Sequence, residues 1–201
     1  MKDTASGNNL SALIGSRICH DLISPLGAIG NGVELLSMSG IGSTSEIALI
    51  AESVESASSR IRFFRVAFGA AAADAMISQN EVQSILRDMY KSGRTRVDWW
   101  VEGELLRAEI KLVFLLIQCL ESTLAWGGQI AIKRSGGNWH LDARGEKLKV
   151  DDDLWNMITD PSATTEVAAS MVHFALVGEA AHAANRRVAS FISETRLTVS
   201  F

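Results

Sequence analysis

The sequence feature that most constrains the fold is a run of apolar residues spaced alternately three and four apart between residues 45 and 68. This spacing predicts an α-helix with a single apolar seam, as in a coiled coil. Ser45 is placed to cap the start of the helix. The seam consists of Ile47, Ile50, Val54, Ala57, Ile61, Phe64 and Phe68. A helix with such a seam needs an apolar partner along its length.

A second long helix is expected just before it, from Asn9 to Met38, because apolar residues recur there at spacings of three and four. The segment SGIGSTS, residues 39–45, separates the two helices, so they should form an antiparallel hairpin. A hairpin covers only part of two apolar stripes. We therefore expect a homodimer in which two hairpins form a four-helix bundle, and packing against the second half of the chain is the alternative.

The second half of the chain has a different pattern, which starts after the small-residue segment Gly69–Ala73. Helices and strands alternate in it, so we expect an α+β layer with helices on one face of a sheet. The predicted domains are residues 1–73 and 74–201. The predicted helices are 81–90, 104–126, 153–158 and 165–185, and the predicted strands are 96–101, 129–134, 138–143, 188–192 and 196–201.

Composition excludes several classes of protein. The 201 residues are 47% hydrophobic and 21% charged, which is typical of a folded globular chain, and the net charge of −4 argues against nucleic acid as a partner. Cys19 and Cys119 are too far apart to suggest a disulfide or metal motif. The most apolar run, LVFLLIQCL, is about half of the ~18 residues that a membrane span requires. We therefore expect a cytoplasmic protein without a membrane partner.

His20 is the strongest candidate for chemistry. If Ile18 and Leu22 point into the seam, His20 lies on the opposite, outward face of the helix. A neutral imidazole is a nucleophile, and the adjacent Asp21 is able to orient it. Pro25 removes one helical hydrogen bond and should kink the helix one turn later, at a cost of about 3 kcal/mol. Such strain suggests a site, although an incidental surface histidine and a simple packing kink are the alternatives.

An arginine cluster is expected near this histidine. In a hairpin that turns near residue 42, position 20 lies opposite position 64, and Arg60, Arg62 and Arg65 surround that position. Guanidinium groups there would steady a phosphoryl group or meet an acidic partner, and a solvated basic helix face is the alternative. The other histidines, His140, His173 and His182, have no metal-ligand spacing and are expected to be structural, so no metal site is predicted.

The segment HDLISPLGAI, residues 20–29, resembles the phospho-acceptor box of histidine kinases, and the order of elements from 75 to 201 resembles their ATP-binding (Bergerat) α/β sandwich. The nucleotide motifs of that domain are missing. The segment LVFLLIQCLESTLAW, in the place of the metal-binding helix, has no asparagine, and the possible adenine loop LDARGEKL has Asp142 and Gly145 at the wrong spacing. The segment TTEVAASMVHF has no glycine that would let the backbone approach a phosphate. The chain therefore resembles the ChpT-type histidine phosphotransferases of alphaproteobacteria, whose dimeric hairpins carry a degenerate kinase-like domain.

That resemblance implies a phosphorelay enzyme without autokinase activity or a cofactor of its own. His20, assisted by Asp21, would exchange a phosphoryl group with the receiver domain of a hybrid kinase and with CtrA-like and CpdR-like response regulators, each receiver holding its own Mg²⁺. Arg17, Ser24 and Arg60 are the expected receiver-docking residues. Ser24 stands where phosphatase-competent kinases carry Thr or Asn. The alternatives are an active histidine kinase and a non-catalytic dimeric module that binds regulators.

Overall fold

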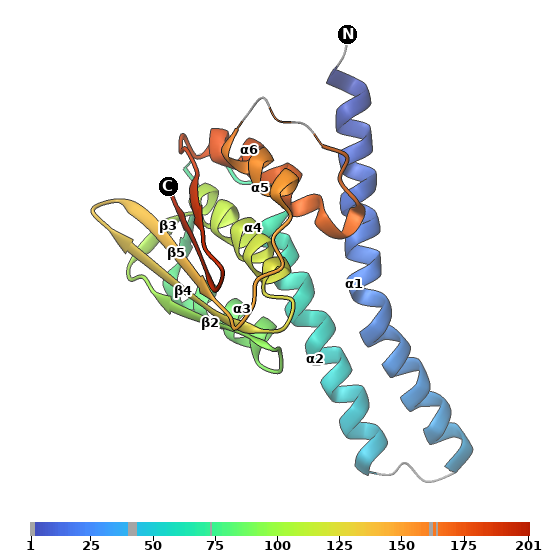
Figure 1. Ribbon diagram of the computed structural model, residues 1–201. Coiled ribbons are helices and arrows are strands. Elements are labelled where there is room, and N and C mark those ends of the chain that lie inside the picture. The colour runs from blue at the N-terminus through green and yellow to red at the C-terminus, as the bar shows by residue number, and fades with distance from the viewer. Residues whose placement is uncertain (1–2, 40–43, 73, 161–162, 164) are drawn as a thin grey trace.

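The structure is a computed structural model, which describes residues 3–39, 44–72, 74–160, 163 and 165–201. Two long helices, α1 (Asp3–Ser39) and α2 (Thr44–Ala67), lie side by side, and the end of this hairpin projects away from a mixed α/β part (Figure 1). The expected α+β class and the expected pair of long helices are confirmed. The dimeric bundle stays a prediction, as does the division at residue 73, which lies outside the described residues.

In the described ranges, the mixed part contains four further α-helices, one 3₁₀ helix and two sheets. The helices are α3 (Gln79–Tyr90), α4 (Arg107–Thr123), α5 (Asp152–Thr159), the 3₁₀ helix η1 (Ala169–Met171) and α6 (Val172–Ala183). The strands are β1 (Met76–Ser78), β2 (Thr95–Trp100), β3 (Glu104–Leu106), β4 (Gly128–Ser135), β5 (Asn138–Arg144), β6 (Ala189–Ile192) and β7 (Arg196–Ser200).

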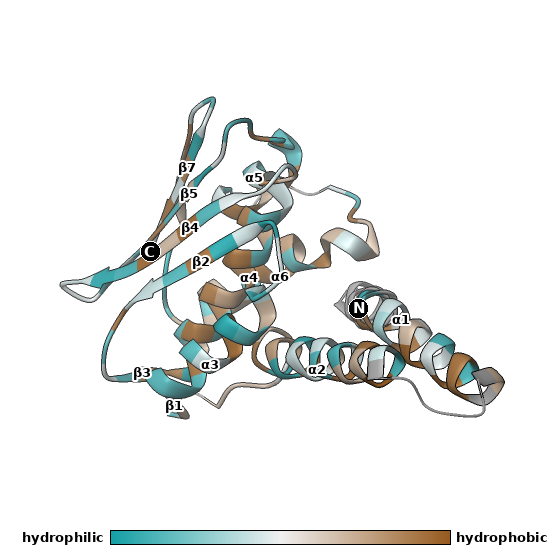
Figure 2. Ribbon diagram, turned by 90° about the horizontal axis from the view of Figure 1, so that it is seen from below, coloured by the Kyte–Doolittle hydropathy of each residue, from teal (hydrophilic) through white to brown (hydrophobic). Residues whose placement is uncertain are grey.

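Five strands form the main sheet in the order β2-β4-β5-β7-β6, in which β2 and β4 are parallel and the other neighbours are antiparallel. The predicted hairpin of β4 and β5 is confirmed. Helices α4, α5 and α6 cover one face of this sheet (Figure 2). The central helix α4 has fully buried residues on all its sides from Leu112 to Ile117, so its apolar run forms the core. No helix in the described ranges has the length and apolarity to cross a membrane.

Two predicted helices are shorter in the structure than in the sequence analysis. The helix expected at 104–126 begins only at Arg107, because residues 104–106 form strand β3, which pairs with β1 and buries Leu105. The helix expected at 165–185 begins at Val172, after residues 165–168, which form no helix or strand, and the 3₁₀ helix η1. Helix propensity is a weak local preference, and pairing with a distant strand or packing against another helix overrides it.

Close packing fixes the register of the helical hairpin. A Cβ atom at Gly32 would lie only 2.5 Å from Cγ1 of Ile50, so the absence of a side chain at Gly32 leaves room for Ile50 where the two helices pack. The predicted register, which places position 32 opposite 52, is therefore right to within two residues. Extending the observed register along the antiparallel helices places Arg60 opposite Leu22, at the level of His20.

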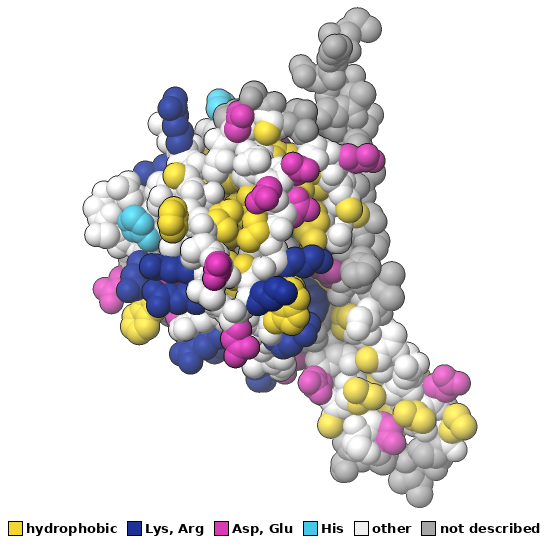
Figure 3. Space-filling view, viewed as in Figure 1, with side chains coloured by type: hydrophobic (Ala, Val, Ile, Leu, Met, Phe, Trp, Pro, Cys, Tyr) yellow, Lys and Arg dark blue, Asp and Glu magenta, His cyan; other side chains and the backbone are white. Residues whose placement is uncertain are grey.

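Helix α2 packs in two directions, which differs from the single seam that the sequence predicts. Phe63 lies outside the predicted seam, yet it is fully buried and its ring stacks on Phe114 of α4 with centroids 4.7 Å apart. Three predicted seam residues, Ile47, Val54 and Ile61, are 56%, 47% and 53% exposed. The mixed part thus covers a second face of α2. Apolar side chains remain at the surface of the projecting end of the hairpin (Figure 3).

Candidate functional site

The six residues predicted to act in the site lie on the two long helices. Helix α1 holds Arg17, His20, Asp21, Ser24 and Pro25, and helix α2 holds Arg60. The backbone at His20 is helical, but its side chain is outside the described residues, so its predicted outward position stays a prediction. Ser24 is exposed, and Pro25 is buried within the continuous helix α1.

Arg17 and Asp21 form an ion pair one turn apart on α1. Nε of Arg17 lies 2.9 Å from Oδ2 of Asp21, and the two side chains are only 21% and 8% exposed. Nη1 of Arg17 also donates a hydrogen bond of 2.6 Å to the backbone carbonyl of Ser170 in η1. These two contacts hold the guanidinium of Arg17 against the mixed part of its own chain. Its role in docking stays a prediction.

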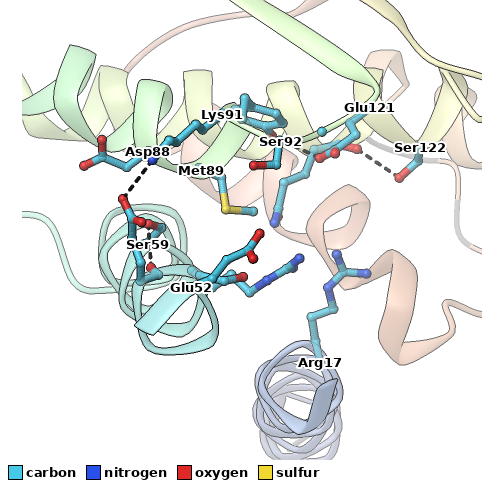
Figure 4. A pocket seen from close by; sticks show the side chains of 15 residues that line it. Arg17, Glu52, Ser59, Asp88, Met89, Lys91, Ser92, Glu121 and Ser122 are labelled. Atoms are coloured by element: carbon cyan, nitrogen blue, oxygen red, sulfur yellow. Dashed lines mark hydrogen bonds and ion pairs between the residues drawn. The ribbon is translucent and has the colours of Figure 1, made fainter. Parts of the chain in front are cut away.

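A cavity of about 480 Å³ lies where α1, α2 and the mixed part meet. Arg17 points into it from α1, Glu52 and Ser59 lie on α2, and Glu121 and Ser122 lie on α4 (Figure 4). The lining is mostly polar and carries both signs of charge. Its other members are Glu55, Ser56, Arg60, Asp88, Met89, Tyr90, Lys91, Ser92, Gly93 and Gln118. Sequence reasoning missed this cavity, because its walls come from four helices that are distant in the chain.

Most charges in the cavity wall are paired. Nζ of Lys91 lies 3.3 Å from Oε1 of Glu55, and the hydroxyl of Tyr90 donates a 3.0 Å hydrogen bond to Oε2 of Glu121. Burial raises the pKa of Glu121, although the Tyr90 hydrogen bond and the nearby Arg17 and Arg60 oppose this shift. Burial, followed by the charge of Glu121, raises the pKa of Tyr90 well above its usual value. The cavity therefore contains a carboxyl group poorly compensated for its loss of water.

The predicted arginine cluster is divided by the mixed part. Nη1 of Arg62 lies 2.8 Å from Oδ2 of Asp88, and Nη2 of Arg65 lies 3.7 Å from Oε1 of Glu81, so both residues attach α2 to α3. Arg60 is half-buried and lines the cavity. It makes no hydrogen bond or ion pair with any side chain that the structure describes. The three arginines therefore do not form the single group that the sequence suggested.

His173 is fully buried beside the cavity, and its Nε2 lies 3.1 Å from the hydroxyl oxygen of Ser122. Burial, assisted by the positive charge of Arg17, lowers the pKa of His173 to about 3. No group of three metal-ligating side chains is arranged around it or elsewhere in the described ranges. The complete burial and the lowered pKa of His173 are those of a histidine packed in the interior, which is the kind of role that the sequence analysis expected.

The pH dependence of stability tests this burial. A histidine in the unfolded chain has a pKa near 6.5, whereas the pKa of folded His173 is about 3. Between these two pH values the unfolded chain binds a proton at this residue and the folded chain does not. The stability that His173 contributes is complete above pH 6.5 and is lost as the pH falls. We expect this group alone to lower the free energy of unfolding by about 2 kcal/mol between pH 6.5 and 5. Urea unfolding at both values should show this decrease in the wild type.

The His173→Gln variant is the control, because glutamine keeps a polar group near Ser122 and does not titrate. Between pH 6.5 and 5, the decrease in its unfolding free energy should be smaller than the decrease in the wild type, and the difference between the two should be about 2 kcal/mol. Glu121 titrates in both proteins, so its contribution cancels in the comparison. Equal changes in the two proteins would show that His173 is protonated in the folded state.

Comparisons with known proteins agree with this architecture. A family model described as the histidine phosphotransferase C-terminal domain matches residues 79–196. Protein phosphotransferase ChpT of Brucella abortus (strain 2308) is 34% identical over 153 residues, which cover 73% of this chain and 73% of that protein. A 1.7 Å structure of a bacterial phosphotransferase aligns over 96% of this chain and 95% of its own, with a TM-score of 0.78 and 26% identity. The chain therefore belongs to the ChpT-type histidine phosphotransferase family.

Proposed function

We propose that this protein carries a phosphoryl group on His20 between the receiver domain of a hybrid histidine kinase and the receiver domains of response regulators of the CtrA-like and CpdR-like kinds. The observation that carries the proposal is the position of the His20–Asp21–Pro25 box on the first helix of a hairpin attached to a domain of this family. ATP takes no part, since the phosphate-binding residues of a kinase are missing from residues 112–126 and 164–174.

The transfer needs a nucleophile and a docking platform rather than a nucleotide site. A ring nitrogen of His20 attacks the phosphorus of the receiver's aspartyl phosphate, the new N–P bond forms, and the bond from phosphorus to the aspartate oxygen breaks. The carboxylate leaves with the bonding electrons, and the reverse reaction loads the next receiver. Mg²⁺ held by the receiver would neutralise charge on the transferring group. The exposed Ser24 would lie under the docked receiver, with Arg17 and Arg60 beside it.

Asp21 has a supporting part in this proposal. Its carboxylate lies 2.9 Å from Arg17, so one of its oxygens is held on the side of the helix that faces the mixed part. A carboxylate fixed there and adjacent to His20 would favour the ring orientation in which the nucleophilic nitrogen is free of its proton. Arg17 then acts on the histidine through Asp21.

The test is to mix the protein with a receiver domain that has been phosphorylated by its kinase with labelled phosphate. The label should move to this protein and survive base but not acid, as a phosphoramidate does. Incubation with labelled ATP alone should give no label, whereas self-labelling would favour the active kinase. Binding of the receiver without any transfer would favour the non-catalytic module. Either result would overturn the proposal.

A homodimer is also part of the proposal, and it is supported by the apolar side chains that α1 and α2 leave exposed. They are Leu26, Val33, Leu35, Met38, Ile47, Leu49, Val54 and Ile61. Burying an apolar side chain of this size stabilises an interface by about 1.5–3 kcal/mol. The variant V54E/I61E places two charges on this surface and is expected to sediment as a monomer, whereas the wild type sediments as a dimer.

Phe191 offers a matched control for this experiment, because it is 69% exposed on β6, outside the hairpin. Phe191→Glu introduces one such charge in place of an exposed apolar side chain and should leave the dimer intact. A wild-type protein that sediments as a monomer at micromolar concentration would remove the bundle from the proposal.

A further inference from the structure

Arg60 stands out among the cations that line the cavity. The Arg17 side chain is held by Asp21 and by the carbonyl of Ser170, and Lys91 is paired with Glu55. Arg60 has no such partner in the part of the chain whose side chains are described. Arg60 is near enough to act on the pKa of Glu121, but the hydrogen bond of that carboxylate comes from Tyr90. A half-buried guanidinium is rarely left without hydrogen-bond acceptors, because its donors lose water without gaining partners.

The hairpin register places this guanidinium close to His20. Gly32 and Ile50 fix the alignment of the two helices, which brings Arg60 level with Leu22, about 3 Å along the axis from position 20. The axes of packed helices lie about 8–10 Å apart, and an extended arginine side chain covers most of that distance. Arg60 and Arg17 line the same cavity, and Arg17 precedes His20 by one helical turn.

The cavity contains a second polar group without a partner. Gln118 is 3% exposed, and its Oε1 accepts no hydrogen bond from the described residues. It lies on α4, across the cavity from the long helices. Buried polar atoms are almost always satisfied, so unmet groups on two walls indicate a space that a polar group or water enters.

We propose that Arg60 is the residue that binds the phosphoryl group carried by His20. This inference rests on the proposed function and adds a residue to the transfer site. The guanidinium would donate to two phosphoryl oxygens at once, the geometry in which arginine binds phosphate best. Arg62 and Arg65 are excluded from this role, since their ion pairs with Asp88 and Glu81 direct them toward α3.

The experiment compares Arg60→Ala with Arg65→Ala as a matched control. Both remove one guanidinium from α2, and Arg65 makes only an exposed 3.7 Å pair, whose loss should leave the fold almost unchanged. A hydrogen bond to a charged group contributes about 1.5–3 kcal/mol, so transfer from a phosphorylated receiver should slow by about 10- to 100-fold in Arg60→Ala. Arg65→Ala should transfer at the wild-type rate, and Arg60→Lys should lie between Arg60→Ala and the wild type.

A second measurement separates direct binding from a structural effect. Phosphoramidate phosphorylates histidine chemically, without a receiver, and phosphorus NMR then follows the ionisation of the phosphoryl group as the pH changes. A neighbouring guanidinium favours the dianion and lowers the phosphoryl pKa. The midpoint should therefore be higher in Arg60→Ala than in the wild type and Arg65→Ala.

The outcomes distinguish this inference from the function on which it rests. If the wild type forms phosphohistidine and transfers it, but Arg60→Ala matches it in rate and midpoint, the role of Arg60 is overturned and the proposed function stands. If a receiver gives the wild type no phosphohistidine, the proposed function fails and the inference fails with it. A slower rate with an unchanged midpoint would mean that Arg60 contacts the receiver and not the phosphoryl group.

Discussion

The His20→Ala variant is expected to lose all transfer of label from a phosphorylated receiver, down to the level of a sample that contains no phosphotransferase. Alanine has no nucleophile, and the described side chains near position 20 on α1, which are Arg17, Asp21 and Ser24, include no second imidazole. Binding of the receiver should persist, because the docking surface spreads over much more than one side chain. Transfer is measured by label on each protein, and binding by calorimetry with the unphosphorylated receiver.

Two other histidines serve as controls for this prediction. His140 on β5 and His182 at the end of α6 are exposed, so each would be available to a small phosphodonor. Neither His140→Ala nor His182→Ala should change the rate of transfer from the receiver. If His20→Ala still accepts label from the receiver and one of these variants does not, the acceptor has been assigned to the wrong histidine.

The long helices are the part of the fold that the sequence predicts best. Their signal is local, since apolar spacing over more than twenty residues averages out single exceptions. The strand hairpin at 128–144 is equally clear, because Gly136 and Gly137 both adopt positive φ between two alternating strands. The short strand β3 was not predictable in this way. Its Leu105 pairs with Ile77 of β1, and α3 and β2 lie between these two strands in the sequence. A strand of three residues is also too short to show a periodic pattern.

The candidate site was predictable only in part, for a related reason. The box around His20 is contiguous, so the sequence is enough to find it. The direction of Arg17 depends on the carbonyl of Ser170, which lies 153 residues away in the chain. The separation of Arg60 from Arg62 likewise depends on Asp88, which captures one guanidinium and leaves the other. Helical spacing places residues on a face, but the packing of the mixed part decides what that face meets.

Helix α2 illustrates the general difficulty. A seam with a regular heptad spacing implies one buried face, yet Phe63 between two seam positions is more deeply buried than Ile61. Two partners compete for this helix, α1 on one side and the α3–α4 layer on another. A pattern read along one helix reports its total apolar surface and does not tell how that surface is shared between partners.

Among the variants proposed for this protein, Glu109→Ala is expected to cause the largest decrease in the free energy of unfolding. Glu109 is 2% exposed near the start of α4, and its carboxylate accepts hydrogen bonds from Nε1 of the buried Trp139, at 3.1 Å, and from Nε of Arg186, at 3.0 Å. Arg134 lies 3.4 Å from the same carboxylate. Removing one partner of a buried ion pair leaves the others uncompensated, so the free energy of unfolding should fall by about 3–5 kcal/mol. Urea unfolding followed by tryptophan fluorescence measures it.

Glu109→Gln and Glu194→Ala separate the causes of this loss. Glutamine keeps one acceptor oxygen for Trp139 but not the charge, so its effect should lie between those of the wild type and Glu109→Ala. Glu194 is exposed, and its replacement should change the free energy of unfolding by less than about 0.5 kcal/mol. A loss below about 1 kcal/mol in Glu109→Ala would mean that water replaces the carboxylate and that the cluster does not hold α4 to β5. Helix α4 also supports α2 through the stacked rings of Phe63 and Phe114. If Glu109→Ala destabilises α4 as expected, phosphotransfer by this variant should be lost at a lower temperature than in the wild type.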